Sequence, residues 1–156
     1  MVSNIYLEKT LKHINGFVGV FAADQISAET FNGALPQYAI VNTKNMTDPA
    51  MGHWLLLSRY EEAGEIILEL FDSFAYPVNI LCENLKDIIR KLHYDCFVTN
   101  NLNVQHLSSQ YCGIYCIGRI LSIRNMETLA DHLNMFSPIL TRNDVIVCDY
   151  IRDQNK

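Results

Sequence analysis

The chain has 156 residues, of which 49% are hydrophobic and 19% are charged, and its formal net charge is −5. This length predicts one domain over residues 1–156, and the hydrophobic fraction is ample for a core. The acidic balance disfavours intrinsic nucleic-acid binding, which needs a basic face. No stretch approaches the roughly 18 consecutive apolar residues of a membrane span, so no membrane association is expected.

Taken in chain order, the apolar spacing predicts these elements: a helix at 3–15, strands at 17–21 and 38–42, a loop at 45–52, paired strands at 53–59 and 65–71, a helix at 85–92, a strand at 96–99, a polar loop at 100–111, and helices at 112–124, at 126–134 and after a cap near 141. The helix at 112–124 is apolar nearly all round, which is typical of a buried helix. The last helix carries Val145, Cys148 and Ile151 on one side. The sequence therefore predicts a small α+β domain whose mixed central sheet packs around the helix that begins at Cys112.

The cysteines indicate the compartment. There are five, at positions 82, 96, 112, 116 and 148, and an odd number without short regular spacing argues against a secreted disulfide framework. No CxxC pair occurs, so no structural zinc site is expected. The N-terminus lacks the basic start and apolar run of a signal peptide. We therefore expect an intracellular protein in a reducing compartment.

Cys112 is the candidate nucleophile. It stands at the mouth of the apolar helix, where free backbone N–H groups and the positive helix end favour a thiolate. A cysteine in such a helix is more often a core residue, a role that suits Cys116 one turn deeper. Gly113 costs a first helical turn about 1 kcal/mol relative to alanine, which indicates that substrate backbone passes close by. A metal site shared by the two cysteines would lack further ligands nearby.

His53 is the candidate general base. It opens a strand after a flexible loop, and Trp54, the only tryptophan, can shield it from water on one side. His106, in the polar loop close to Cys112 in sequence, is the competing candidate. The remaining histidines are expected at the surface of amphipathic helices: His13, His93 and His132.

Asp72 and Gln105 complete the candidate site. Asp72 ends an apolar strand, and a hairpin would bring it to His53, where its carboxylate could fix the imidazole tautomer. A turn residue is the simpler role for this aspartate. Gln105 can donate its amide to a developing oxyanion, with the Cys112 N–H as second donor. Gln110 could do so instead, but it is closer to the nucleophile in the chain and less free to reach across a cleft.

These residues, in the order His, Asp, Gln, Cys, resemble the adenain (adenovirus-type) cysteine endopeptidases and the related proteases of ubiquitin-like modifiers. Four blocks carry the resemblance, which covers about residues 17–124: Ala39 to Thr43, Gly52-His53-Trp54, Phe71-Asp72-Ser73-Phe74, and Gln105 to Cys112-Gly113. The resemblance implies the papain-related, adenain-like fold, with His53 as base, Asp72 as its orienter, Gln105 as oxyanion donor and Cys112 as nucleophile. Trp54 and Gly113 would lie beside the substrate.

The resemblance further implies cleavage of viral capsid or core precursor proteins during virion maturation, in the virion or the host nucleus. It implies an activating peptide, which would be linked near Cys96, and activation by DNA, which the acidic composition disfavours. Asp72 stands where adenovirus enzymes usually have glutamate. We expect a monomer without cofactor or metal. Two alternatives stay open: a deconjugating protease for ubiquitin-like modifiers, and an inactive binding module of the same fold.

Overall fold

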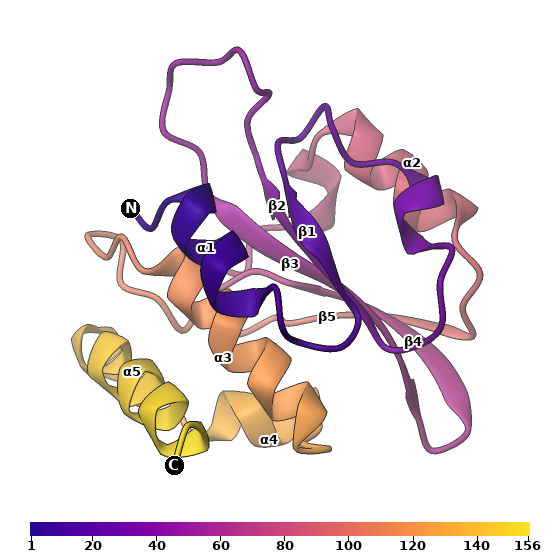
Figure 1. The fold of residues 1–156 in the computed structure, drawn as a ribbon. Coiled ribbons are helices and arrows are strands. Elements are labelled where there is room, and N and C mark those ends of the chain that lie inside the picture. The colour runs from indigo at the N-terminus through magenta and orange to yellow at the C-terminus, as the bar shows by residue number, and fades with distance from the viewer.

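The computed structural model describes all 156 residues, and its centre is a five-stranded mixed sheet in the order β1-β2-β3-β4-β5 (Figure 1). The strands are β1 (Phe17–Phe21), β2 (Gln37–Asn42), β3 (Trp54–Glu62), β4 (Glu65–Phe71) and β5 (Cys96–Thr99). The two outer pairs, β1 with β2 and β4 with β5, are parallel, whereas β3 is antiparallel to both of its neighbours. The predicted mixed sheet is therefore confirmed.

Helices cover both faces of this sheet. They are α1 (Asn4–Leu11), α2 (Glu83–Lys91), α3 (Cys112–Arg124), α4 (Leu129–Asn134) and α5 (Asn143–Gln154). Figure 1 shows α2 on one side of the sheet and α3 on the other, with α1, α4 and α5 around α3. None of these helices is long and apolar enough to span a bilayer.

Side chains along β3 alternate between two hydrophobic cores, as the pleat of a strand requires. Trp54 and Leu56 belong to the core beneath α3, and Leu55 and Leu57 belong to the core that includes α2 residues. Because both faces are covered, the strand reads as a continuous apolar run rather than as an alternating one.

α3 is buried as predicted, because nearly its whole surface is apolar. Its Gly118 allows α5 to approach closely, since a Cβ there would lie 2.8 Å from Val147 Cγ2. Arg119 is fully buried and pairs with Glu69 of β4, Nη2 to Oε1 at 2.8 Å. The helix is thus fixed to the sheet by apolar packing and by one ion pair.

The predicted order of elements is confirmed, and the bounds of four of them match to the residue: 17–21, 65–71, 96–99 and 112–124. The first helix ends at Leu11 rather than at residue 15, because the chain turns there toward β1 with Gly16 at a φ of 90°. α4 begins at Leu129 rather than at residue 126, because Met126 has a φ of 61° and Thr128 caps the helix.

The side of α5 that packs against the core includes one of the three residues predicted to share a side, Ile151. The helix begins at Asn143, directly after Arg142, and the side that faces the core carries Val147. Val145 on the predicted side is 63% exposed. Asn143 is fully buried at the start of the helix, where its Nδ2 donates to the Val104 and Ser137 carbonyls.

His132 was predicted at the surface, and this prediction is wrong. The residue is fully buried on α4, where its ring packs against the rings of Phe71, Phe136 and Tyr150. Neither ring nitrogen has a hydrogen-bond partner. Burial, helped by the charge of Arg119, lowers the pKa of His132 to about 3. The imidazole behaves as a neutral aromatic core residue because α5 and the sheet close over the side of α4 that carries it.

Candidate active site

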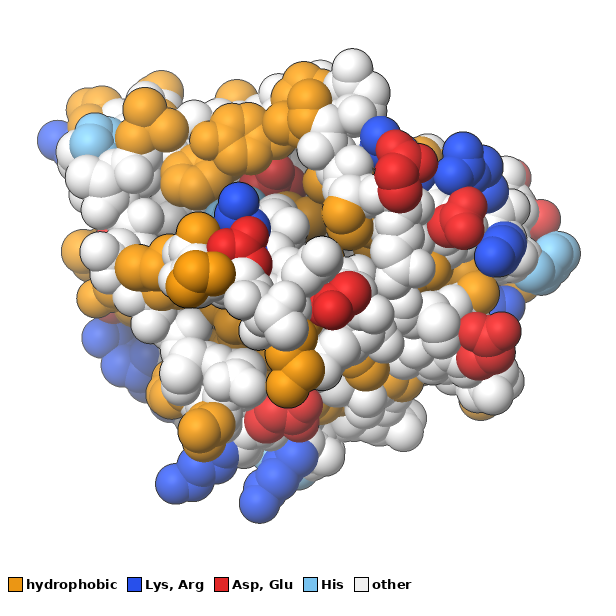
Figure 2. Space-filling view, turned by 90° about the horizontal axis from the view of Figure 1, so that it is seen from above, with side chains coloured by type: hydrophobic (Ala, Val, Ile, Leu, Met, Phe, Trp, Pro, Cys, Tyr) orange, Lys and Arg blue, Asp and Glu red, His pale blue; other side chains and the backbone are white.

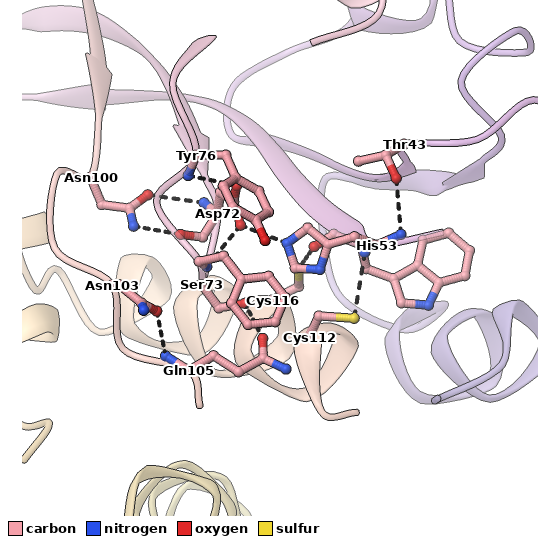
Figure 3. A network of polar contacts seen from close by, with 12 residues as sticks. Thr43, His53, Asp72, Ser73, Tyr76, Asn100, Asn103, Gln105, Cys112 and Cys116 are labelled. Carbon is pink, nitrogen blue, oxygen red and sulfur yellow. Dashed lines mark hydrogen bonds and ion pairs between the residues drawn. The ribbon is translucent and has the colours of Figure 1, made fainter. Parts of the chain in front are cut away.

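The β3–β4 hairpin brings His53 and Asp72 together. Leu56 lies opposite Phe71, so the residues that precede β3 and follow β4 meet at one end of the hairpin. His53 Nε2 and Asp72 Oδ1 are 2.6 Å apart, and the two side chains are only 13% and 4% exposed (Figure 3). A hairpin with this register therefore gives the histidine a buried carboxylate partner.

The Asp72 carboxylate is held in place by backbone donors. Oδ1 accepts from the Phe74 N–H at 2.9 Å, and Oδ2 accepts from the Tyr76 N–H at 3.1 Å. Ala75, between these two residues, has a φ of 54°, which makes the turn tight enough for both contacts. The carboxylate is thus oriented toward His53 before any ligand binds.

Asn100 fixes the backbone of Asp72, and the sequence analysis missed it. The Asp72 N–H donates to Asn100 Oδ1 at 2.9 Å, and Asn100 Nδ2 donates to the Asp72 carbonyl at 2.6 Å. Asn100 directly follows β5, and because β5 is parallel to β4, the carboxyl ends of the two strands meet. An asparagine directly after a predicted strand was the signal that could have identified it.

At Gly52, just before β3, there is no room for a Cβ atom. A Cβ there would lie 1.7 Å from Asn42 Oδ1. The His53 N–H donates to Thr43 Oγ1 at 3.0 Å, and the His53 carbonyl accepts from the Thr43 N–H at 2.9 Å. The end of β2 therefore sets the backbone position of the histidine.

Two aromatic rings border the His53 imidazole. The Phe74 ring lies 4.7 Å away between centroids with an interplanar angle of 33°, and the Tyr76 ring lies 6.3 Å away, edge on. A ring face stabilises a nearby cation, so the Phe74 ring favours the imidazolium form. Tyr76 was not identified from the sequence.

Cys112 occupies a place where the sheet opens. β4 turns away after Phe71, so Trp54 of β3 has no strand partner on that side. Its N–H donates to Cys112 Sγ at 3.5 Å, and its carbonyl accepts from Cys116 Sγ at 3.7 Å. Cys112 is 3% exposed, whereas burial raises the pKa of the fully enclosed Cys116 thiol well above its usual range. Cys116 is thus a core residue, as predicted.

His53 lies between Asp72 and Cys112 in Figure 3. Its Nε2 contacts Asp72, which leaves Nδ1 for the thiol. Burial lowers the pKa of His53, but the hydrogen bonds and charges of Asp72 and Cys112 outweigh burial and raise it to about 9. The imidazole is therefore protonated at neutral pH, which is the condition for a thiolate–imidazolium pair.

Gln105 is fully buried, and Figure 3 shows its side chain extending beneath the start of α3 toward Cys112. Its Nε2 donates to the Ser109 carbonyl at 3.0 Å and to Ser109 Oγ at 3.1 Å, and its Oε1 accepts from Ser73 Oγ. Because a carbonyl can only accept, the Ser109 contact fixes which end of the amide is the nitrogen.

The two competing candidates lie elsewhere. Gln110 is exposed, and His106 Nδ1 contacts Ser108 Oγ at 2.7 Å within its own loop.

The structure contains no group of three or more His, Cys, Asp or Glu side chains that could hold a metal ion.

Trp54 and Gly113 pack against each other beneath α1. Trp54 is 6% exposed, and its Nε1 donates to the Val2 carbonyl at 2.9 Å. A Cβ at Gly113 would lie 3.1 Å from Leu7 Cδ2 and 3.3 Å from Trp54 Cδ1. This close packing gives the glycine a structural reason, and contact of either residue with substrate stays a prediction.

One hollow is lined by His53, and a second is lined by its neighbours Gly52 and Trp54. One of about 280 Å³ is lined by His53, Asp72, Tyr76 and Ile80 among others, and one of about 400 Å³ lies beside Met51 in the 45–52 loop. A hollow of about 480 Å³ at the far end of β3 includes none of the candidate site residues. The first hollow offers space for a side chain beside the imidazole, and the second offers space beside the chain that leads into His53.

No protein-family model matches the chain, and no curated protein matches it in sequence. Among solved structures, it is similar to the ASFV pS273R protease, with a TM-score of 0.62 and 15% identity over 99% of this chain and 66% of that one. It is also similar to AvrA, in a structure with IP6 and CoA, with a TM-score of 0.52 and 15% identity over 94% of this chain and 53% of that one. The chain thus spans less than two thirds of either structure. At such identities the likeness concerns the fold, and it confirms the predicted papain-related α+β fold, with a mixed sheet packed around the helix that begins at Cys112.

Proposed function

We propose that this chain is a cysteine-type endopeptidase of the adenain-like group, related to the proteases of ubiquitin-like modifiers. One observation carries the proposal: a single imidazole, His53, lies between a buried carboxylate at 2.6 Å and the thiol at the start of α3. A raised histidine pKa beside a cysteine in a nearly closed site is typical of a functional pair rather than of a core.

In the proposed reaction, the Cys112 thiolate attacks the scissile carbonyl carbon. The oxyanion that forms accepts from Gln105 Nε2 and from the Cys112 N–H. His53 Nδ1–H then protonates the leaving amine as the C–N bond breaks, which leaves a thioester on the sulfur. A water molecule deprotonated by His53 attacks this thioester and releases the acid and the thiolate.

Asp72 would keep its hydrogen bond to His53 Nε2–H throughout this cycle, because two backbone N–H groups hold its carboxylate in place. Its task in the proposal is to present Nδ1 to the sulfur and to stabilise the imidazolium. The same chemistry would serve a deconjugating enzyme, so the substrate is a separate part of the proposal.

The proposed substrate is a viral precursor protein of capsid or core type. The four ordered blocks around the site residues support it, and so does the shared fold with a viral protease. Large apolar side chains are exposed on the loops beside the site, including Met46, Met51 and Tyr76, as suits contact with a polypeptide. On the face shown in Figure 2, acidic and basic side chains are interspersed rather than gathered into a basic area.

The proposed activating peptide would link to Cys96, which is an exposed free thiol on β5. A location in the virion or host nucleus belongs to the same proposal, whereas the net charge of −5 disfavours activation by DNA. Mass spectrometry under non-reducing conditions tests the peptide link, since an active enzyme without an adduct on Cys96 would contradict it.

The test of the proposed function is cleavage of a capsid-type precursor, set against modifier fusions that end in Gly-Gly. We expect cleavage of the precursor, a loss of at least about 10³-fold in Cys112→Ser, and normal cleavage by Cys148→Ser, a control at an exposed cysteine. Preference for the modifier fusion would favour the deconjugating alternative. Absence of cleavage together with slow, unselective iodoacetamide labelling would identify an inactive binding module.

A further inference from the structure

We propose that Asp144, at the start of α5, is a positioning residue for the oxyanion donor Gln105 and acts through Ser109. This inference rests on the proposed function and adds a part of the machinery outside residues 17–124, the region of the adenain resemblance. It makes the C-terminal helix a component of the active site although no residue of α5 lies beside the thiol.

A continuous chain of hydrogen bonds joins α5 to Gln105. Asp144 Oδ1 accepts from Ser109 Oγ at 2.8 Å and from the Tyr115 hydroxyl at 2.8 Å. Ser109 Oγ in turn accepts from Gln105 Nε2 at 3.1 Å and from the Tyr111 N–H at 3.2 Å. The serine hydroxyl thus connects the carboxylate with the amide and with the residue before Cys112.

The Asp144 carboxylate determines the direction of this hydroxyl. A serine hydroxyl has one hydrogen and two acceptor lone pairs. Because the hydrogen is given to Asp144, both lone pairs face the donors from Gln105 and Tyr111. A bond to an ionised acceptor is about twice as strong as a neutral one, so the aspartate holds the hydroxyl more firmly than an amide would.

The same end of α5 also holds the backbone beside Gln105. Asn143 is fully buried, and its Nδ2 donates to the Val104 carbonyl at 2.8 Å. From the opposite side, the Ser73 carbonyl accepts from the Val104 N–H at 2.9 Å and from the Gln105 N–H at 3.1 Å. The Gln105 segment is therefore clamped between the residue after Asp72 and the start of α5.

This arrangement leaves Gln105 able to serve the oxyanion. Its nitrogen has two hydrogens, and both Ser109 acceptors belong to one residue, so one N–H can be shared between them. The second N–H then stays available, in a direction set by Ser109. Because a misplacement of about 1 Å can cost roughly 10²-fold in rate, the support behind the amide matters as much as the amide.

The test compares Asp144→Asn and Ser109→Ala with the control Asp149→Asn, an exposed carboxylate on the same helix that pairs with Arg152. We expect each of the first two variants to lower kcat by about 10- to 100-fold with little change in KM, and the control to match wild type. The double variant should be no slower than the slower single variant, because both changes break one chain of contacts.

Two further readouts separate positioning from a general loss of structure. Iodoacetamide alkylation of Cys112 needs no oxyanion donor, so its rate in both variants should stay within about twofold of wild type. A peptide aldehyde forms a hemithioacetal whose oxygen occupies the oxyanion position, so its affinity should fall in parallel with kcat. Unchanged kcat in both variants, or alkylation that falls as much as kcat, would overturn the inference.

The inference and the proposed function fail in different ways. If wild type cleaves nothing but binds the aldehyde at Cys112, the endopeptidase proposal fails, and aldehyde affinity in the variants still decides the role of Asp144. If wild type cleaves the precursor and both variants cleave it equally fast, only the inference fails. A wild type that neither cleaves nor binds the aldehyde overturns both.

Discussion

Glu69 and Arg119 form a two-pronged ion pair in which neither side chain is exposed to solvent. Arg119 Nε lies 2.8 Å from Glu69 Oε2, and Arg119 Nη2 lies 2.8 Å from Glu69 Oε1. Glu69 is on the strand that ends before Asp72, and Arg119 is on the helix that begins at Cys112. Through this pair the elements that carry the carboxylate and the thiol are fixed in one register.

Glu69→Gln should destabilise the protein by about 3–5 kcal/mol, because it leaves the guanidinium of Arg119 buried without a counter-charge. Urea unfolding measures the change. Glu65→Gln, at the exposed start of the same strand, is the matched control and should change the free energy of unfolding by less than about 0.5 kcal/mol. Equal effects of the two substitutions would show that the pair does not hold the helix on the sheet.

The pH dependence of cleavage should report the His53 imidazolium. Burial lowers the pKa of His53, but the contacts with Asp72 and Cys112 outweigh burial and raise the pKa from 6.5 to about 9. The imidazole is therefore fully protonated below pH 6.5 and loses its proton as the pH rises through about 9. We therefore expect kcat/KM to fall above about pH 9, where the proton for the leaving amine is gone. A pH–rate profile checks this, and a fall already complete near pH 7 would contradict it.

Asp72→Asn should move that alkaline limb to lower pH, because the carboxylate is a principal cause of the raised pKa of His53. Turnover should also fall by about 10²- to 10⁴-fold, since the imidazole loses the partner that orients it. Asp95→Asn, a carboxylate beside β5 that contacts the Ile66 N–H, provides a control far from the thiol. An unchanged limb in Asp72→Asn would place the third catalytic group elsewhere.

Gly52→Ala should reduce cleavage strongly, because the new Cβ would lie 1.7 Å from Asn42 Oδ1 and must displace the chain that leads into His53. Adding Asn42→Ala removes the two nearest atoms, Asn42 Oδ1 and Cγ, and leaves Lys44 Cγ at 2.9 Å, on a flexible side chain that can move. The double variant should therefore recover much of the lost kcat, which steady-state kinetics would measure. Gly64→Ala is the control in the β3–β4 turn: its φ of 83° strains the backbone of an alanine, although no atom lies within 4 Å, so it should lower stability and leave kcat unchanged.

Acid stability should depend on His132. Burial, with the charge of Arg119, lowers the pKa of His132 from 6.5 to about 3. Between pH 6.5 and about pH 3, the unfolded chain therefore binds a proton at this residue that the folded protein does not bind. Stability should therefore fall by about 1.4 kcal/mol for each pH unit below 6.5. His132→Phe, which keeps an aromatic ring among Phe71, Phe136 and Tyr150, should flatten this part of the profile relative to wild type. His13→Phe, at an exposed histidine after α1, is the control, and equal profiles for wild type and His132→Phe would contradict the expectation.

Most elements of the fold could be predicted because their signals are local. β4 and α3 are apolar runs bounded by turn residues and a polar loop, and their ends agree with the prediction to the residue. The approach of His53 to Asp72 followed from the same signals, since two strands joined by a short turn bring their outer ends together. Residue types and their order along the chain were enough to select the four candidates for the site.

What could not be predicted depends on contacts between distant segments. His132 reads as a polar residue on an amphipathic helix, and it is buried by the packing of α4 against the sheet and α5. Asn100 supports Asp72 because β5 happens to lie parallel to β4, a pairing that the local sequence does not encode. The polar contacts of Asn143 and Asp144 with the Gln105 loop likewise join distant segments, and the apolar spacing of α5 does not encode them.

The contact between the Trp54 amide and Cys112 Sγ bears on the design of an inert form of this protein for trapping its target. Cys112 Sγ is the sole acceptor for the Trp54 N–H, which has no partner in the sheet. Cys112→Ala would therefore leave this buried N–H without a hydrogen bond, at a cost of about 1–3 kcal/mol. A hydroxyl at position 112 retains an acceptor while removing the soft nucleophile. Cys112→Ser is accordingly the better inactive variant for capturing the target. If Cys112→Ala captured the target more weakly than Cys112→Ser, the cause would be its lower stability rather than a lost substrate contact.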